Sequence, residues 1–97
     1  MKIPLTKGLF ARVDSVDFVP LLQHNWYATK SRNDFYAVRN VRENGQRKKV
    51  YMHRFIMDCP DGKCVHHING DTLDNHRINL EVCSMKTNQG YRSDRGT

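Results

Sequence analysis

Short turn-forming segments divide this sequence, and the most informative of them is the dipeptide Asn44-Gly45. Asn-Gly is typical of a two-residue β-hairpin turn, because both residues readily adopt the positive φ that this turn requires. The dipeptide therefore predicts a hairpin with strands at 36–42 and 47–51. Aromatic and β-branched residues at 26–29 and 35–38, separated by a polar turn cluster, predict a hairpin immediately before it. Together the two hairpins predict a small antiparallel sheet with a basic face.

The other elements in the first part of the chain are expected to be short. A strand is predicted at 9–13, after a turn at Lys7-Gly8. The apolar segment 16–22 contains Pro20, so a helix there must be short or must begin at the proline. Residues 52–57 can continue the preceding strand or form a single helical turn.

The second part of the chain predicts the order strand, long loop, strand, helix. The strands are expected at 63–68 and 80–83, and the polar loop between them begins with a tight turn at 69–71. Ser84 is a suitable N-cap for a final helix at 85–89. The expected fold class is therefore α+β, with a small antiparallel sheet in the N-terminal region followed by the strand-loop-strand-helix unit.

Composition places the chain among single-domain globular proteins. Its 97 residues allow one domain with a modest core. A hydrophobic share of 38% and a charged share of 27% are ordinary for a soluble protein and exclude a disordered one. No stretch approaches the roughly 20 apolar residues of a membrane span, and the N-terminus lacks the apolar part of a secretion signal. The three cysteines are therefore expected to stay reduced, which predicts a cytoplasmic location.

Positive charge is concentrated in one segment. The formal net charge is +6, and residues 30–54 alone hold eight basic and two acidic residues. Phe35, Tyr36 and Tyr51 are interleaved with these cations, which favours binding of nucleic acid over a merely solvated surface. Arg54 has a second interpretation, the packing of the sheet against the second part of the chain. The side chains predicted to contact DNA are Arg39, Arg42, Arg47, Lys48, Lys49, Arg54 and Arg77.

Two adjacent histidines, His66 and His67, stand at the predicted end of a strand, just before a turn. Asn79 follows twelve residues after His67, and Asn88 follows nine residues later in the predicted final helix. Each residue alone has an ordinary structural explanation. Neighbouring residues of a regular strand point to opposite faces, so both histidines can serve one site only if the strand ends or twists here.

The run 65–84 strongly resembles the HNH endonucleases of the phage and homing type. The shared features are His-Ile-Asn-Gly at 67–70, Leu-Asp-Asn at 73–75 and Asn-Leu at 79–80, and the segment 52–57 fits as well. This resemblance implies a ββα-metal fold around one divalent ion, with hydrolysis of a DNA phosphodiester bond as the reaction.

The resemblance also implies a role for each residue of the constellation. His67 matches the general base that takes a proton from the attacking water, and Asn79 matches the asparagine that ties down the loop and orients this base. His66 and Asn88 match the metal ligands. Most relatives carry aspartate in place of His66, and a neutral imidazole is a softer ligand than a carboxylate. The metal could therefore be Mg²⁺, Mn²⁺, Ni²⁺ or Zn²⁺.

DNA is the partner that the resemblance implies, within one domain over 1–97. The basic, β-rich part at 1–57 is expected to contact DNA, and the ββα-metal part at 58–97 is expected to be catalytic. One active site per chain is expected to nick one strand, so a double-strand break needs a homodimer or two events. The expected setting is the cytoplasm of a bacterial or phage-infected cell.

Two other interpretations stay open at this point. The chain can be a non-catalytic DNA-binding module that keeps the same scaffold. Alternatively, Cys59, Cys64 and Cys83 can be ligands of a structural zinc, although Cys83 is more simply explained as a small apolar residue in the last strand. A plasmid-nicking assay with and without EDTA separates the nuclease from the binding module.

Overall fold

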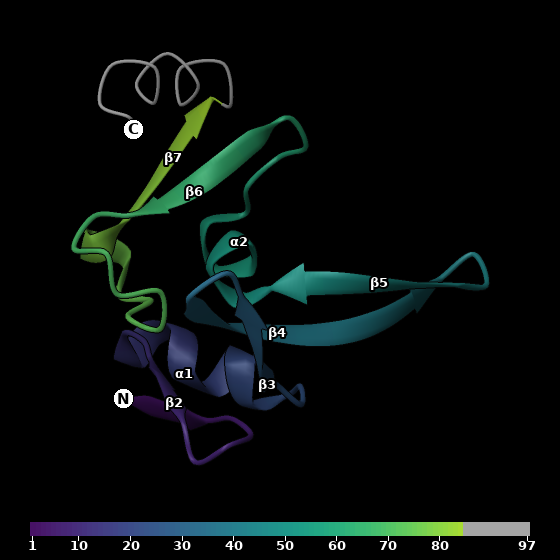
Figure 1. Cartoon of the computed structure of the whole chain (residues 1–97), viewed down its shortest axis with the longest axis horizontal. Helices are drawn as coiled ribbons and strands as arrows, with labels where there is room; N and C mark the ends of the chain where they lie inside the picture. The colour runs from purple at the N-terminus through teal and green to yellow at the C-terminus, as the bar shows by residue number, and fades with distance from the viewer. Residues whose placement is uncertain (85–97) are drawn as a thin grey trace.

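The computed structural model describes residues 1–84, and these residues form three small antiparallel sheets linked by short helices (Figure 1). The α+β class expected from the sequence is confirmed. The expected final helix at 85–89, and Asn88 with it, lie outside the described residues. The elements in chain order are β1 (Lys2–Pro4), β2 (Phe10–Arg12), α1 (Ser15–Leu22), β3 (Tyr27–Ser31), β4 (Asp34–Glu43), β5 (Gln46–Tyr51), α2 (Met52–Met57), β6 (Lys63–His67), the 3₁₀ turn η1 (Arg77–Asn79) and β7 (Leu80–Ser84).

Both predicted hairpins are present in one sheet of order β3-β4-β5. Strands β4 and β5 pair in one regular register up to Glu43↔Gln46, and Asn44 and Gly45 have φ angles of 53° and 76°. The turn between β3 and β4 is shorter than expected. It contains only two residues and starts at Arg32, whose φ is 59°.

Three short elements refine or correct the predictions. Strand β1 was missed because three residues cannot display an alternating pattern, yet Ile3 pairs with Ala11 of β2 and both are buried. Helix α1 is short, but it begins before Pro20 rather than at it and ends two residues after it. Residues 52–57 form helix α2 and do not continue β5.

The hydrophobic core draws on both parts of the chain. Trp26 is 6% exposed, and its Nε1–H donates a hydrogen bond of 2.8 Å to the carbonyl oxygen of Leu21. Leu80 of β7 packs into the same cluster, so burial of apolar surface holds the strand-loop-strand unit against the N-terminal part. The buried members are Ile3, Ala11, Val13, Leu21, Trp26, Ala37, Met52, Ile56 and Leu80.

The long loop between β6 and β7 is anchored to β2 and α1. The backbone N–H of Arg12 donates to the carbonyl of Leu73 over 2.9 Å, and the N–H of Asn75 donates to the carbonyl of Arg12 over 2.7 Å. The guanidinium of Arg77 also pairs with the buried carboxylate of Asp17, with Nη2 and Oδ1 2.8 Å apart. These contacts hold the loop in one place, although it contains little regular structure.

The β4–β5 hairpin extends away from the rest of the molecule (Figure 1). Its outer half is almost entirely exposed. Within residues 1–84, no helix has the length and apolar character that crossing a membrane requires.

Candidate active site

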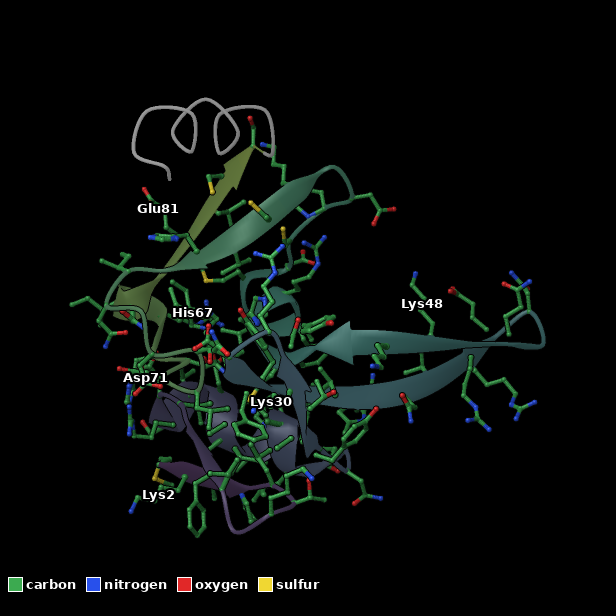
Figure 2. The ribbon with its side chains drawn as sticks, viewed as in Figure 1. Lys2, Lys30, Lys48, His67, Asp71 and Glu81 are labelled. Carbon is green, nitrogen blue, oxygen red and sulfur yellow. The ribbon has the colours of Figure 1, made fainter. Side chains whose placement is uncertain are left out.

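His67 is the last residue of β6 and is buried, with 7% of its surface exposed. Figure 2 shows it between the β6–β7 ribbon and the body of the protein. Its Nε2 lies 2.8 Å from Oδ1 of Asn75, a fully buried side chain of the following loop. A carboxamide oxygen only accepts hydrogen bonds, so His67 donates its Nε2–H here. The lone pair of the neutral imidazole is then on Nδ1.

A second imidazole and two tyrosine rings surround His67. The ring centroids of His53 and His67 are 4.8 Å apart, and those of Tyr36 and His67 are 6.2 Å apart. Tyr51 completes the cluster, with its ring centroid 5.5 Å from that of His53. His53 is 8% exposed, and its buried Nδ1 has no hydrogen-bond partner within residues 1–84.

Burial makes both imidazoles weaker bases than histidine in water. The pKa of His53 is lowered to about 3, first by burial and then by the neighbouring charges of His67 and Arg54. Burial also lowers the pKa of His67, although the hydrogen bond to Asn75 acts in the opposite direction. Both side chains are therefore neutral at pH 7, and a neutral His67 is able to accept a proton.

Asn79 closes the loop that follows His67. Its Oδ1 accepts a hydrogen bond of 2.8 Å from the backbone N–H of Asn69, and its Nδ2 donates one of 2.9 Å to the carbonyl of Asp74. The backbone N–H of Ile68 also donates to the carbonyl of Asn79 over 2.9 Å. Asn79 thus joins the two ends of the loop and contacts both sides of it, whereas the side-chain hydrogen bond of His67 goes to Asn75.

His66 lies on the other face of the β6–β7 ribbon. It is exposed and stands opposite Glu81, which is also exposed. Figure 2 shows Glu81 on the outer side of the ribbon, away from His67. Because β6 keeps a regular register through His67, the two adjacent imidazoles point to opposite faces, and the structure does not bring them together.

The described residues supply only part of a metal site. An exposed imidazole beside a carboxylate is a donor pair that suits Zn²⁺, Mn²⁺ or Ni²⁺. Within residues 1–84, however, no group of three or more histidine, cysteine, aspartate or glutamate side chains could hold a metal ion. Asn88, the other predicted ligand, lies outside this range. Cys64 and Cys83 face each other across the ribbon, with their sulfur atoms 3.5 Å apart.

The predicted DNA contacts fall into two groups. Arg42, Arg47, Lys48 and Lys49 are exposed on the β4–β5 hairpin. Their positions leave them accessible to a large ligand.

The other three predicted contacts are engaged within the protein. The guanidinium of Arg39 lies 5.7 Å from the ring centroid of Trp26. Arg54 donates to the carbonyls of Lys63 and Pro60 over 2.7 and 3.2 Å. Since Arg77 is paired with Asp17, all three arginines hold elements of the fold together, as one interpretation of Arg54 anticipated.

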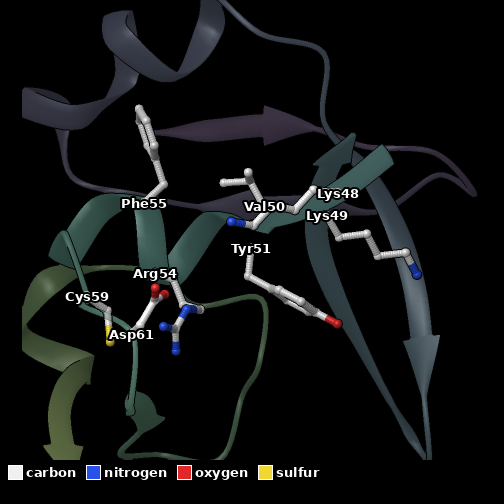
Figure 3. A pocket seen from close by; sticks show the side chains of 8 residues that line it. All are labelled: Lys48, Lys49, Val50, Tyr51, Arg54, Phe55, Cys59 and Asp61. Carbon is white, nitrogen blue, oxygen red and sulfur yellow. The ribbon is translucent and has the colours of Figure 1, made fainter. Parts of the chain in front are cut away.

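A surface pocket of about 350 Å³ lies at the root of the hairpin, between β5 and α2 (Figure 3). It adjoins the cluster around His67, because Tyr51 belongs to both. Figure 3 shows the side chains of Lys49 and Tyr51 pointing to one side and that of Phe55 pointing away from them. The pocket is lined by Lys48, Lys49, Val50, Tyr51, Arg54, Phe55, Cys59 and Asp61.

Comparison with known protein families gives a match in the second part of the chain. Residues 50–89 match the family model described as HNH endonuclease, which covers less than half of the chain. The match runs from β5 through α2 and the β6–loop–β7 unit, and it confirms the resemblance to HNH nucleases over this segment. It suggests nuclease activity on DNA. No curated protein and no solved structure matches the chain significantly.

Sequence reasoning assigned no role to three residues of this region. Asn75 lies in the Leu-Asp-Asn part of the resemblance and could have been noted there, but its contact with His67 has no local signal. His53 reaches His67 only through the tertiary fold. Glu81 could have been found from the register of β6 and β7, since it stands opposite His66.

Proposed function

We propose that this chain is a metal-dependent endonuclease that hydrolyses phosphodiester bonds of DNA. The observation that carries the proposal is the HNH endonuclease match over 50–89, which contains the whole unit of β6, its loop and β7. Within this unit, His67 stands at the end of a strand beside a loop that Asn79 closes. Histidine at a fixed position, neutral at pH 7, is the side chain most often used as a general base.

In this proposal His67 takes a proton from the attacking water. The hydrogen bond from its Nε2–H to Asn75 leaves Nδ1 as the nitrogen that accepts the proton. Asn75 thereby orients the ring, and Asn79 keeps the loop that carries Asn75 in place. General-base catalysis of this kind contributes typically about 10²–10⁴-fold to the rate.

His66 and Asn88 are the residues that we propose as ligands of one divalent ion, and Glu81 is a further donor beside His66. A bound ion would offset the negative charge that develops on the phosphate and the leaving oxygen. Imidazole coordination favours Mn²⁺, Ni²⁺ or Zn²⁺ over Mg²⁺. With one such site per chain, we expect a monomer to nick one strand and a homodimer to be needed for a double-strand break.

Lys48 is already paired with Glu43. The other exposed cations of the β4–β5 hairpin, Arg42, Arg47 and Lys49, are proposed to bind the DNA backbone. Their charge is not needed for folding, because their side chains project into solvent. By the resemblance to phage and homing enzymes, we further propose a role in homing, phage DNA processing or host DNA degradation, in the cytoplasm of a bacterial or phage-infected cell.

A non-catalytic DNA-binding module is the second candidate, and one observation favours it. His66 and His67 point to opposite faces of the ribbon, so the proposed ligand and the proposed base are not on one surface. This arrangement would suit a scaffold that has lost its reaction and kept its DNA contacts.

A plasmid-nicking assay separates the two candidates. Purified protein is incubated with supercoiled plasmid in Mg²⁺, Mn²⁺, Ni²⁺ or Zn²⁺, and with EDTA. The nuclease predicts relaxed circles with at least one metal and none with EDTA, whereas the binding module predicts a mobility shift without nicking. Nicking that persists in EDTA would contradict the metal dependence.

A further inference from the structure

The two faces of the β4–β5 hairpin differ in their charged side chains. Alternate residues of a strand point to opposite faces, and the register places Arg42 opposite Arg47 and Asn40 opposite Lys49 on one face. Lys48 lies on the other face with Glu43, and its Nζ is 3.6 Å from the Glu43 carboxylate. We call the first surface the tyrosine face. It consists of the buried Val38 and of Tyr36, Asn40, Arg42, Arg47, Lys49 and Tyr51.

The cations of the tyrosine face are not balanced within the protein. Arg42 and Arg47 are direct cross-strand partners, and like charges in this position destabilise a sheet. Among residues 1–84, neither of them nor Lys49 takes part in an ion pair. Lys48, by contrast, is already paired. An arrangement that costs stability in the free protein is expected where a polyanion supplies the missing negative charge.

The tyrosine face leads to the candidate base. Tyr51 follows Lys49 on the same face, and its ring contacts His53. Tyr36 lies beside it, and its ring centroid is 6.2 Å from that of His67. Figure 3 shows Lys49 and Tyr51 pointing to the same side of β5. One surface therefore runs from the unpaired cations near the hairpin tip to the rings that contact His67.

We propose that duplex DNA lies on the tyrosine face of the hairpin and not on the face that carries Lys48. Its phosphates meet Arg42, Arg47 and Lys49, and its backbone continues over Tyr51 toward His67. The proposal rests on the proposed function, which supplies DNA as the partner. Arg47 is four residues from Tyr51, or about 13 Å along the strand. This is the rise of about four base pairs, whereas Lys49, two residues from Tyr51, lies about two base pairs along. The contacted phosphates therefore lie on one side of the cleaved bond, about two or more base pairs away.

Two neighbouring lysines provide a matched test. Lys48→Gln and Lys49→Gln each remove one exposed positive charge, from adjacent positions on opposite faces. Binding of each full-length variant to a mixed-sequence duplex is measured in EDTA over a range of salt concentrations. We expect Lys49→Gln to reduce the slope of log K against log salt by about one, and Arg42→Gln with Arg47→Gln to reduce it by about two. Lys48→Gln should leave the slope as in wild type.

Equal loss of slope in Lys48→Gln and Lys49→Gln would overturn the assignment of the face, and so would a slope that none of the variants changes. Neither result would contradict the proposed nuclease activity, which the plasmid-nicking assay tests separately. Conversely, a protein that never nicks plasmid but shows the difference between the two lysines would refute the nuclease and retain the DNA-binding face. Phosphate-ethylation interference gives a second measurement, with contacts expected on one side of the nick only.

Discussion

His53 makes the folded state sensitive to acid. Its side chain is 8% exposed, its Nδ1 has no hydrogen-bond partner within residues 1–84, and its pKa is lowered from 6.5 to about 3. In the unfolded chain the same imidazole takes up a proton near pH 6.5. Below this pH the unfolded state therefore binds one more proton than the folded state, and the free energy of unfolding falls as the pH falls.

The magnitude follows from the two pKa values. The contribution of His53 to stability is fully present above pH 6.5 and is lost progressively between pH 6.5 and pH 3, at about 1.4 kcal/mol per pH unit. Lowering the pH from 7.5 to 5.5 should thus cost about 1.4 kcal/mol through this one residue. A domain of this size has a total stability of roughly 5–15 kcal/mol, so the loss is easily measured.

Urea unfolding at pH 7.5 and pH 5.5 tests this prediction. The loss of unfolding free energy between the two pH values should be about 1.4 kcal/mol smaller in His53→Leu than in wild type. Ile56→Val is a matched control from the same helix, because it removes a buried methylene group and no titrating group. It should lower stability by about 0.5–1.5 kcal/mol at both pH values and leave the pH dependence unchanged. An identical acid loss in wild type and His53→Leu would refute the reasoning.

Three further predictions concern the site and its ribbon. His67→Ala should reduce plasmid nicking by about 10²–10⁴-fold while DNA affinity in EDTA stays near wild type, and nicking within a few-fold of wild type would exclude His67 as the base. Nicking should be faster with Mn²⁺, Ni²⁺ or Co²⁺ than with Mg²⁺ at equal low concentration, and His66→Asp should shift this ranking toward Mg²⁺. An unchanged ranking would exclude His66 as a ligand. Oxidised glutathione should link Cys64 to Cys83 and not to Cys59, because the first two face each other with sulfur atoms 3.5 Å apart. This link should stabilise the protein by about 3 kcal/mol, and peptide mapping under non-reducing conditions that finds Cys59 in the disulfide would contradict the pairing.

The sequence by itself determined the features that depend on neighbouring residues. Asn44-Gly45 specifies its hairpin because the positive φ angles belong to these two residues. The resemblance to HNH endonucleases is likewise carried by a continuous run, and the family match covers it. The same resemblance implied that Asn79 ties down the loop. In the fold, the side chain of Asn79 makes two hydrogen bonds that close this loop.

Only the tertiary structure decided what surrounds His67 and which cations remain accessible. His53 and Asn75 contact His67 from different segments of the chain. Internal partners hold Arg39, Arg54 and Arg77, and the local sequence does not predict these partners. Likewise, Lys48 and Lys49 are adjacent in sequence and chemically alike, yet the strand register places one beside Glu43 and the other on the tyrosine face. The physical reason is the same in each case. Turn geometry is a property of a few consecutive residues. The burial of a side chain, its ion-pair partner and the face of the sheet on which it lies depend instead on contacts between segments that are distant in the chain.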